Sequence, residues 1–216
     1  MLTKKCGSAL TKRGFKKGNV FAILLPNIPE YPIIYYGVIL IGGTVTTMNP
    51  LYTEDEIAHQ LKDATAQHII TIPLFAEKVK QSASKVGIET VFVVGEADGC
   101  EPFSALFQDD GEDFPEDVPF DPKNDTACLA YSSGTTGSPK GVMLTHFNLI
   151  ADASIALHER FYLLNENPVV LGLLPFFHAF GQMTSLSCAL LKGATVVCVA
   201  KFEPESFLKI MQDYKV

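Results

Sequence analysis

Apolar runs of five or six residues alternate along this chain with longer amphipathic segments. The runs that predict strands are residues 20–25, 68–72, 90–94, 127–131, 169–173 and 194–199. The segments that predict helices are residues 30–41, 53–64 (with a capping box between Thr53 and Glu56), 73–85, 145–160, 179–191 and 204–213. Strands that alternate with helices of this length are typical of right-handed βαβ crossovers and a mainly parallel sheet. We therefore expect an α/β fold.

The composition is that of a globular protein. Hydrophobic residues make up 47% of the 216 residues and charged residues 19%, which argues against a disordered chain. The formal net charge of −7 argues against a general nucleic-acid binder. The negative charge is concentrated, because eleven acids and one base lie between Glu96 and Asp125, and the rest of the chain holds 13 acids and 16 bases. An anionic small-molecule ligand such as a nucleotide is compatible with that remainder.

The acidic stretch predicts a solvated connector, since it contains Pro115, Pro119 and Pro122 among its carboxylates. A metal site is a weaker interpretation because no spaced His or Cys accompanies the acids. The connector divides the chain near residue 120 into two α/β lobes, residues 1–120 and residues 121–216.

Three further features bear on the compartment. The five cysteines form no CxxC pair, and buried free thiols in a reducing compartment explain them best. The uncharged runs 31–53 and 167–191 are long enough to cross a bilayer, but Gly, Pro and polar interruptions suit buried helices and flanking loops better, so we expect no transmembrane segment. The six bases of residues 1–17 faintly resemble a transit peptide, yet an exposed helix with its loop is the better interpretation.

The segment with the most chemical information runs from Tyr131 to Gly141, with the sequence YSSGTTGSPKG. Glycines and small residues let a backbone approach a ligand closely, several hydroxyl groups can donate hydrogen bonds, and Lys140 adds one positive charge. This chemistry suits a phosphate cradle, although the spacing matches neither a Walker A loop nor a GxGxxG fingerprint. A flexible Ser/Gly linker is the alternative, and the strand that leads in and the apolar residues 142–144 that lead out argue against it.

The run from Tyr131 to His146 resembles the phosphate-binding signature of the acyl-adenylate-forming superfamily, which includes acyl-CoA synthetases, 4-coumarate–CoA ligases, luciferases and the adenylation domains of peptide synthetases. The resemblance continues through nearly the whole chain. It is carried by Leu25-Pro-Asn27, Asn49-Pro-Leu-Tyr-Thr53, His59-Gln-Leu61, Leu174-Pro-Phe-Phe-His178 and Lys201-Phe-Glu203, which match the ligase and luciferase branch. The implied fold is two layered, mainly parallel βα lobes that form part of the large N-terminal domain of such an enzyme.

The resemblance implies a role for each matching residue. The positions that match those holding the ATP phosphates and the pyrophosphate leaving group are Ser132, Ser133, Gly134, Thr135, Thr136, Gly137 and Lys140, and Lys140 and Thr136 count with His178 as catalytic. His178 matches the histidine beside the acyl and adenylate groups, although a histidine in an apolar run is more often a core residue. Phe180 and Thr184 match acyl-pocket positions. Lys201 matches a lysine that contacts CoA, and by itself would be a surface lysine. No protein ligand to a metal is assigned.

The implied activity is an acid–thiol ligase: a carboxylic acid is activated with ATP and Mg²⁺ to acyl-AMP, pyrophosphate leaves, and the acyl group passes to CoA. Aromatic, medium-chain and long-chain acids are all open as substrates, and the expected compartment is the cytosol or the peroxisome. The chain supplies about two fifths of a family member and lacks the C-terminal domain, so we expect it to be a fragment that is inactive alone. The alternatives are a luciferase-like enzyme with another acceptor and a non-catalytic isoform with a regulatory or binding role.

Overall fold

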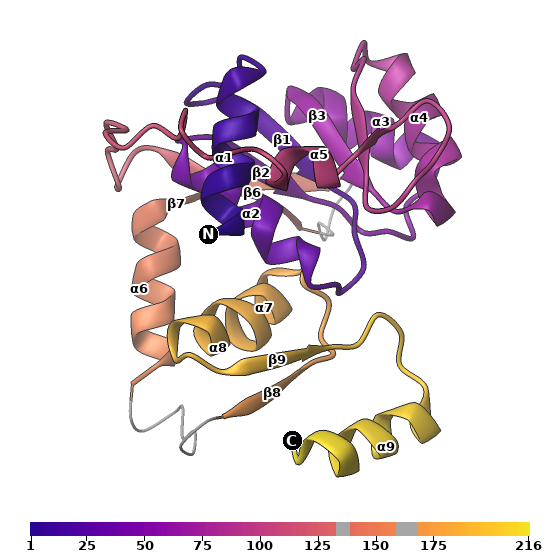
Figure 1. Cartoon of the computed structure of the whole chain (residues 1–216), viewed down its shortest axis with the longest axis vertical. Coiled ribbons are helices and arrows are strands. Elements are labelled where there is room, and N and C mark those ends of the chain that lie inside the picture. The colour runs from indigo at the N-terminus through magenta and orange to yellow at the C-terminus, as the bar shows by residue number, and fades with distance from the viewer. Residues whose placement is uncertain (133–138, 159–167) are drawn as a thin grey trace. The chain divides into compact units, whose positions relative to one another are not determined.

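The computed structural model describes residues 1–132, 139–158 and 168–216 (Figure 1). The described chain forms two compact units. The first unit contains Met1–Leu25 and Glu30–His146, and the second contains Pro26–Pro29 and Phe147–Val216. The acidic connector, where the sequence placed a lobe boundary near residue 120, lies inside the first unit.

The first unit is built on a seven-stranded sheet with the strand order β5-β4-β3-β1-β2-β6-β7. Neighbouring strands are parallel except β6 and β7, which pair antiparallel. This matches the expected α/β class with a mainly parallel sheet. The strands are β1 (Val20–Ile23), β2 (Thr44–Thr47), β3 (Ala66–Thr71), β4 (Val91–Val93), β5 (Glu101–Pro102), β6 (Thr126–Ser132) and β7 (Lys140–Thr145).

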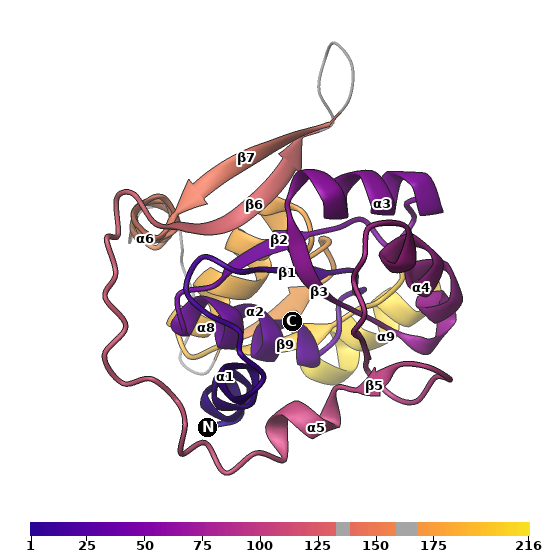
Figure 2. The same cartoon turned by 90° about the horizontal axis from the view of Figure 1, so that it is seen from above.

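Helices cover both faces of this sheet. Figure 2 shows α1, α2 and α5 along one face and α3 and α4 along the other. The helices are α1 (Leu2–Lys12), α2 (Glu30–Leu40), α3 (Glu54–Asp63), α4 (Ala76–Lys85, after the 3₁₀ turn η1, Pro73–Phe75) and α5 (Ser104–Phe107). The predicted capping box is confirmed, because Thr53 Oγ1 accepts from Glu56 N at 3.3 Å and Glu56 Oε2 accepts from Thr53 N at 2.7 Å.

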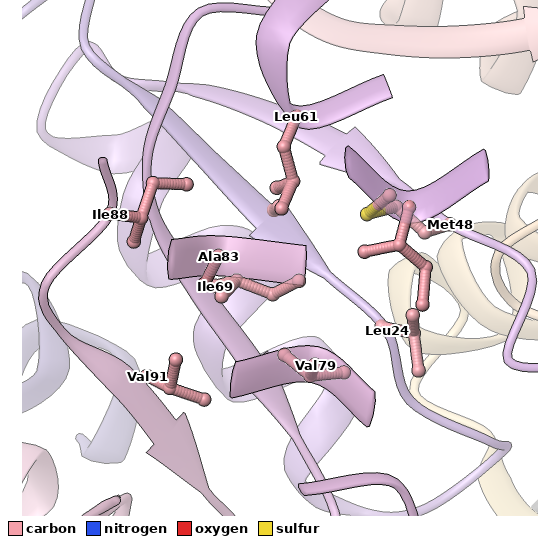
Figure 3. Packing of buried hydrophobic residues seen from close by; sticks show 10 residues of the cluster. Leu24, Met48, Leu61, Ile69, Val79, Ala83, Ile88 and Val91 are labelled. Carbon is pink, nitrogen blue, oxygen red and sulfur yellow. The ribbon is translucent and has the colours of Figure 1, made fainter. Parts of the chain in front are cut away.

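The core under α3 and α4 consists of side chains that point toward one another from both helices and from the sheet (Figure 3). Ile69 and Leu24 are fully buried there, and Leu61 and Val79 cover them from the two helices. Burial of this many aliphatic groups fixes α3 and α4 against the sheet. The buried members are Ala22, Leu24, Met48, Ile57, Leu61, Ile69, Val79, Ala83, Ile88 and Val91.

Strand β2 was not expected from the sequence, where residues 31–53 were interpreted as a buried helix with flanking loops. The helical part is correct, since α2 covers Glu30–Leu40, but Thr44–Thr47 form a fully buried central strand. Their hydroxyl groups are satisfied by neighbouring backbone: Thr44 Oγ1 donates to Thr126 O at 2.7 Å and Thr46 Oγ1 to Leu129 O at 3.2 Å. These bonds let polar side chains occupy the middle of a parallel sheet.

The acidic connector is held against the N-terminal helix rather than free in solvent. Lys12 Nζ lies 3.0 Å from Asp109 Oδ2, 2.9 Å from Asp110 Oδ1 and 3.3 Å from Asp113 Oδ2. Further ion pairs join α1 and its loop to this half of the unit: Lys4–Glu116, Arg13–Glu101 and Lys17–Asp125. Four of the bases in residues 1–17 therefore pair with carboxylates of residues 101–125. Helix α1 was expected from the sequence to be exposed, but its residues 6–10 are buried.

The second unit has a parallel two-stranded sheet of β8 (Val169–Gly172) and β9 (Thr195–Cys198). The segment between them was predicted as one helix over 179–191. It consists of α7 (Ala179–Gly181), a π-helical stretch η2 (Gln182–Ser187) and α8 (Cys188–Leu191). Helix α6 (His146–Ala156) packs on this segment through Ala153, Met183 and Cys188, and α9 (Pro204–Tyr214) follows β9.

The five cysteines, all among the described residues, are free thiols. Cys6, Cys128 and Cys188 are buried, and burial raises the pKa of the Cys6 and Cys128 thiols to about 12. These two thiols are therefore neutral and unreactive at physiological pH. In the described parts of the chain, every helix is too short or too polar to cross a bilayer.

Candidate functional site

The carboxyl ends of β1, β2 and β6 lie at one edge of the first unit's parallel sheet, which is where α/β proteins bind ligands. Strand β6 ends at Ser132 and β7 begins at Lys140, and these two residues are direct partners in the antiparallel pair. Directly opposed residues carry their side chains on one face, with Cβ atoms about 5 Å apart. The structure thus brings together the hydroxyl and the ammonium group at the two ends of the predicted phosphate loop, and both are exposed.

The other predicted phosphate contacts fall outside the described residues. They are Ser133, Gly134, Thr135, Thr136 and Gly137. The described part of the predicted phosphate site is therefore the pair Ser132 and Lys140, with Tyr131 before it and Gly141 after it.

A cavity of ≈ 290 Å³ adjoins this strand pair. It is lined by Tyr131 and Pro139 on the hairpin and by Tyr52, Asp55, Glu56, His59 and Gln60 from the start of α3. Hydrogen bonds from the backbone and side chain of Thr53 lower the pKa of Glu56, and the hydrogen bond from Lys85 lowers the pKa of Asp55. Both carboxylates are therefore ionised at neutral pH. This acidic wall disfavours a polyphosphate inside the cavity, whereas the hydroxyl of Ser132 and the ammonium group of Lys140 could both donate hydrogen bonds to an anion.

Tyr131 connects the hairpin to α3. Its hydroxyl donates a hydrogen bond to Asp63 Oδ2, on the last residue of α3, at 2.5 Å. Its ring covers its cross-strand partner Gly141, where a Cβ atom would lie 3.1 Å from the ring Cζ. Position 141 therefore favours glycine because the ring occupies the place of a side chain. Tyr131 was quoted from the sequence only as the first residue of the motif, and nothing there indicated its partner Asp63.

In the second unit, the segment before His178 is held by one buried amide. Asn27 Nδ2 donates to Gly172 O and to Leu174 O, both at 2.9 Å, and Phe176 N donates to Asn27 Oδ1 at 2.8 Å. All of the hydrogen bonds lie within the second unit, because Pro26–Pro29 belong to it. The asparagine of the Leu25-Pro-Asn27 motif therefore shapes residues 172–176. In the sequence, the only indication of this role is that Asn27 lies between Pro26 and Pro29.

His178 is the N-cap of α7 and is exposed. Its Nδ1 accepts from Phe180 N at 3.3 Å, so Nδ1 carries no proton and the neutral ring would hold its proton on Nε2. His178 is therefore not a buried core residue, which was the alternative interpretation of the sequence. The side chain has one nitrogen fixed by the helix and the other available as a donor.

Phe180 and Thr184 follow on consecutive turns. Phe180 is 60% exposed, and Thr184 Oγ1 donates to Phe180 O at 2.7 Å. Gly181 between them packs directly on the backbone, since a Cβ there would lie 2.7 Å from Leu174 O. Thr184 lies in the π-helical stretch η2, a rare conformation that is frequent at functional sites. The structure thus brings His178, Phe180 and Thr184 together in one short segment.

Lys201 lies after β9, separate in sequence from that segment. Its side chain is 82% exposed and its Nζ lies 3.1 Å from Glu203 Oε1, an exposed pair that stabilises the fold little. In the described residues no group of three or more His, Cys, Asp or Glu side chains could hold a metal ion. In the first unit, Ser132 and Lys140 can therefore offer hydrogen bonds and a positive charge to an anion. In the second unit, His178 offers an exposed imidazole and Phe180 an exposed aromatic ring.

The family match and the similar curated proteins agree with each other. The AMP-binding enzyme family matches residues 2–216. Probable 4-coumarate–CoA ligase 1 of Dictyostelium discoideum is 36% identical over 230 residues, and 4-coumarate–CoA ligase 2 of Petroselinum crispum is 36% identical over 219 residues. The alignments cover 99% and 100% of this chain, and 42% and 40% of the relatives.

Solved structures show the same fold over nearly the entire chain. A long-chain-fatty-acid–CoA ligase from Archaeoglobus fulgidus is similar with a TM-score of 0.83 and 31% identity, over 99% of this chain and 42% of that one. A red-emitting luciferase from Phrixothrix hirtus is similar with a TM-score of 0.89 and 27% identity, over 100% and 42%. The chain thus spans about two fifths of the length of the relatives it matches.

Proposed function

Because the chain belongs to the AMP-binding enzyme family, we propose that it is part of an enzyme that activates a carboxylic acid with ATP. The acid attacks the α-phosphorus, pyrophosphate leaves, and the acyl-AMP then passes its acyl group to the thiol of CoA. The observation that carries the proposal is the pairing of Ser132 with Lys140 at the carboxyl edge of the sheet, within a chain 36% identical to 4-coumarate–CoA ligases. We place this reaction in the cytosol or the peroxisome, which the free thiols support.

The chemistry needs charge neutralisation and positioning more than a protein nucleophile. A carboxylate and a triphosphate are both anions, so bringing them together is the main barrier that the protein can lower. Lys140 and the hydroxyl of Ser132 bind the phosphates, together with residues 133–137. Mg²⁺ arrives with ATP and supplies further charge neutralisation. The raised pKa values of the Cys6 and Cys128 thiols agree with a reaction that uses no cysteine nucleophile.

The second unit supplies the groups for the acyl and acceptor substrates in this proposal. His178 presents its Nε2 to the carboxylate and adenylate, and the fixed Nδ1 supports a donor at that position. Phe180 and Thr184 line the acyl pocket, in keeping with the exposure of the phenyl ring. Lys201 contacts CoA, for which its exposed ammonium group is suited.

Titration of the purified 216-residue chain with pyrophosphate and with MgATP tests the phosphate site. We expect Lys140→Ala to weaken binding roughly ten- to a hundredfold, because a hydrogen bond to a charged group contributes about 1.5–3 kcal/mol. Lys62→Ala is the matched control, since Lys62 is an exposed lysine of the same unit. Equal affinity of Lys140→Ala and the parent chain would contradict the proposed site.

The acceptor is tested in a chimera in which this chain replaces the matched part of the Petroselinum crispum ligase. Formation of acyl-CoA from ATP, CoA and a panel of carboxylic acids, lost in the Lys140→Ala chimera, supports the ligase. Adenylate formation without acyl-CoA favours a luciferase-like enzyme with another acceptor, in line with the similarity to a luciferase structure. Failure to bind or use a nucleotide in both experiments leaves the non-catalytic alternative.

A further inference from the structure

The position of Ser132 and Lys140 depends on the register of two strand ends. Tyr131 precedes Ser132, Gly141 follows Lys140, and the two pairs are consecutive rungs of the β6–β7 ladder. β7 is the edge strand of the sheet, so β6 is its one strand neighbour in the described residues. At the end of an edge strand, a contact from outside the ladder adds a restraint on the register.

The side chain of Tyr131 makes such a contact. Its hydroxyl reaches Asp63, and its ring lies on Gly141 with the hydroxyl oxygen 3.3 Å from the place of a Cβ there. The ring also lines two cavities, the one of ≈ 290 Å³ beside the start of α3 and another of ≈ 460 Å³ beside Asp63 and Met143. Tyr131 is thus part of the lining of both cavities.

The partner of Tyr131 is firmly anchored to the sheet. Helix α3, which ends at Asp63, is held by buried Ile57 and Leu61. Gln60 Nε2 also donates to Thr46 Oγ1 at 2.9 Å and to Thr47 O at 3.0 Å. A hydrogen bond from Tyr131 to this helix therefore ties the hairpin to a rigid part of the fold.

Asp63 is the last residue of α3, a position where a carboxylate destabilises the helix. The carboxyl end of a helix carries a partial negative charge, so an anion in the last turn is unfavourable. The hydroxyl of Tyr131 offsets this by donating to the carboxylate. Burial, together with the bond to Asp63, raises the pKa of Tyr131, so the phenol stays protonated and remains a donor. An acid at this position is better explained by its bond to the hairpin than by the stability of α3.

We propose that Asp63, Tyr131 and Gly141 form a latch that sets the positions of Ser132 and Lys140 for phosphate binding. All three are positioning residues: they act through Ser132 and Lys140 and touch no substrate. The expected effect of the latch on the affinity for ATP rests on the proposed function. The structural part of the inference, the restraint on β7, stands on the contacts alone.

MgATP titration of the 216-residue chain tests the consequence. Tyr131→Phe keeps the ring on Gly141 and removes the donor, and Asp63→Ala removes the acceptor. We expect each to weaken MgATP binding about two- to tenfold, the range for loss of one hydrogen bond. Asp63→Asn keeps an acceptor and restores part of the affinity. Tyr52→Phe, at another tyrosine that lines the smaller cavity, leaves affinity unchanged.

Two readouts separate positioning from general stability. Asp63→Ala relieves the unfavourable charge at the end of α3, so its melting temperature stays equal to that of the parent or rises while its affinity falls. In a Lys140→Ala background, Tyr131→Phe causes much less than its own fold-change, because the lysine through which it acts is gone. A full, independent loss in that background would overturn the latch, as would unchanged affinity in the single variants.

Hydrogen exchange of the β7 amides, residues 140–145, tests the restraint without any nucleotide. We expect faster exchange in Tyr131→Phe and in Asp63→Ala, and parent-like exchange in Tyr52→Phe. Unchanged exchange in the first two variants overturns the latch whether or not the chain binds ATP. Lack of MgATP binding by the parent chain counts against the proposed function alone, and the exchange rates then decide the latch.

Discussion

Replacement of Asn27 by aspartate changes one buried group from a donor to an acceptor. Asn27 is 6% exposed, and its amide nitrogen donates to two carbonyl oxygens while its oxygen accepts from Phe176 N. In Asn27→Asp the bond from Phe176 can remain. The second carboxylate oxygen, however, faces the carbonyl oxygens of Gly172 and Leu174, which repel it. In Asn27→Ala all three bonds are lost.

The cost of the two variants follows from which groups are left unpaired. Gly172 O also accepts from Val199 N at 3.0 Å, so it keeps one partner in either variant. Asn27→Ala removes the hydrogen bonds of Asn27 with Phe176 N–H and with Leu174 O, which costs roughly 2–6 kcal/mol at about 1–3 kcal/mol each. Asn27→Asp keeps the first of these but buries a charge against two dipoles, which costs roughly 3–5 kcal/mol at neutral pH.

The aspartate variant carries a pH dependence that the alanine variant lacks. Burial and the facing carbonyl groups raise the pKa of the introduced carboxyl above its unfolded value of about 3.9. A raised folded pKa of an acid means that stability is fully present below the unfolded pKa and is lost as the pH rises through the folded pKa. We therefore expect Asn27→Asp to lose stability, relative to Asn27→Ala, between pH 5 and pH 8.

Urea unfolding at pH 5 and pH 8, followed by circular dichroism, measures both variants. Exchange of the Phe176 amide reports the second unit locally, in case the two units unfold separately. Asn49→Asp is the control, because Asn49 Oδ1 accepts from Leu51 N at 3.0 Å and a carboxylate keeps that bond. The reasoning is refuted if the difference between Asn27→Asp and Asn27→Ala is the same at both pH values.

Three further perturbations have defined outcomes. Burial lowers the pKa of His68, so the fold loses stability as the pH falls below about 6.5, and His68→Phe should become more stable relative to the parent between pH 7.5 and pH 5 in urea unfolding. Lys12→Met leaves three carboxylates unneutralised and should lower the melting temperature, by an amount that shrinks in 1 M NaCl; an undiminished effect would mean that packing, not charge, is involved. Ile69→Ala, at a fully buried core position, should cost about 2–5 kcal/mol in urea unfolding, and a loss below 1 kcal/mol would show that the cavity collapses.

The sequence predicted the elements whose signal is local. All six apolar runs lie on strands, with ends shifted by one or two residues, and the capping box of α3 is present as expected. Strand β2 was missed because Thr44–Thr47 have no apolar alternation, and their burial depends on acceptors more than 80 residues away in the chain. Strand β7 was missed because Val142 and Met143 were interpreted only as an apolar exit from the loop, although they pair with β6.

In the candidate site, too, the sequence predicted residues from their local pattern but not the contacts between residues far apart in the chain. Residue types and spacing identified Ser132 and Lys140, and the structure adds that they are cross-strand partners. The contacts of Tyr131 with Asp63 and of Asn27 with Phe176 join residues 68 and 149 positions apart. A single sequence carries no signal for such pairs, since each partner alone is an ordinary polar residue.

The placement of Asn27 in the second unit sets an order of events during synthesis. The first unit has all its strands once residue 145 has been made, but Asn27 must wait for Phe176, 149 residues after it. At about 5–20 residues per second this delay is roughly 7–30 s. During that time residues 26–29 lack the hydrogen bonds that Asn27 makes with Gly172, Leu174 and Phe176 in the folded chain. A chain arrested before residue 172 would never form these bonds, so we expect limited proteolysis to cut it faster between β1 and α2 than it cuts the 216-residue chain.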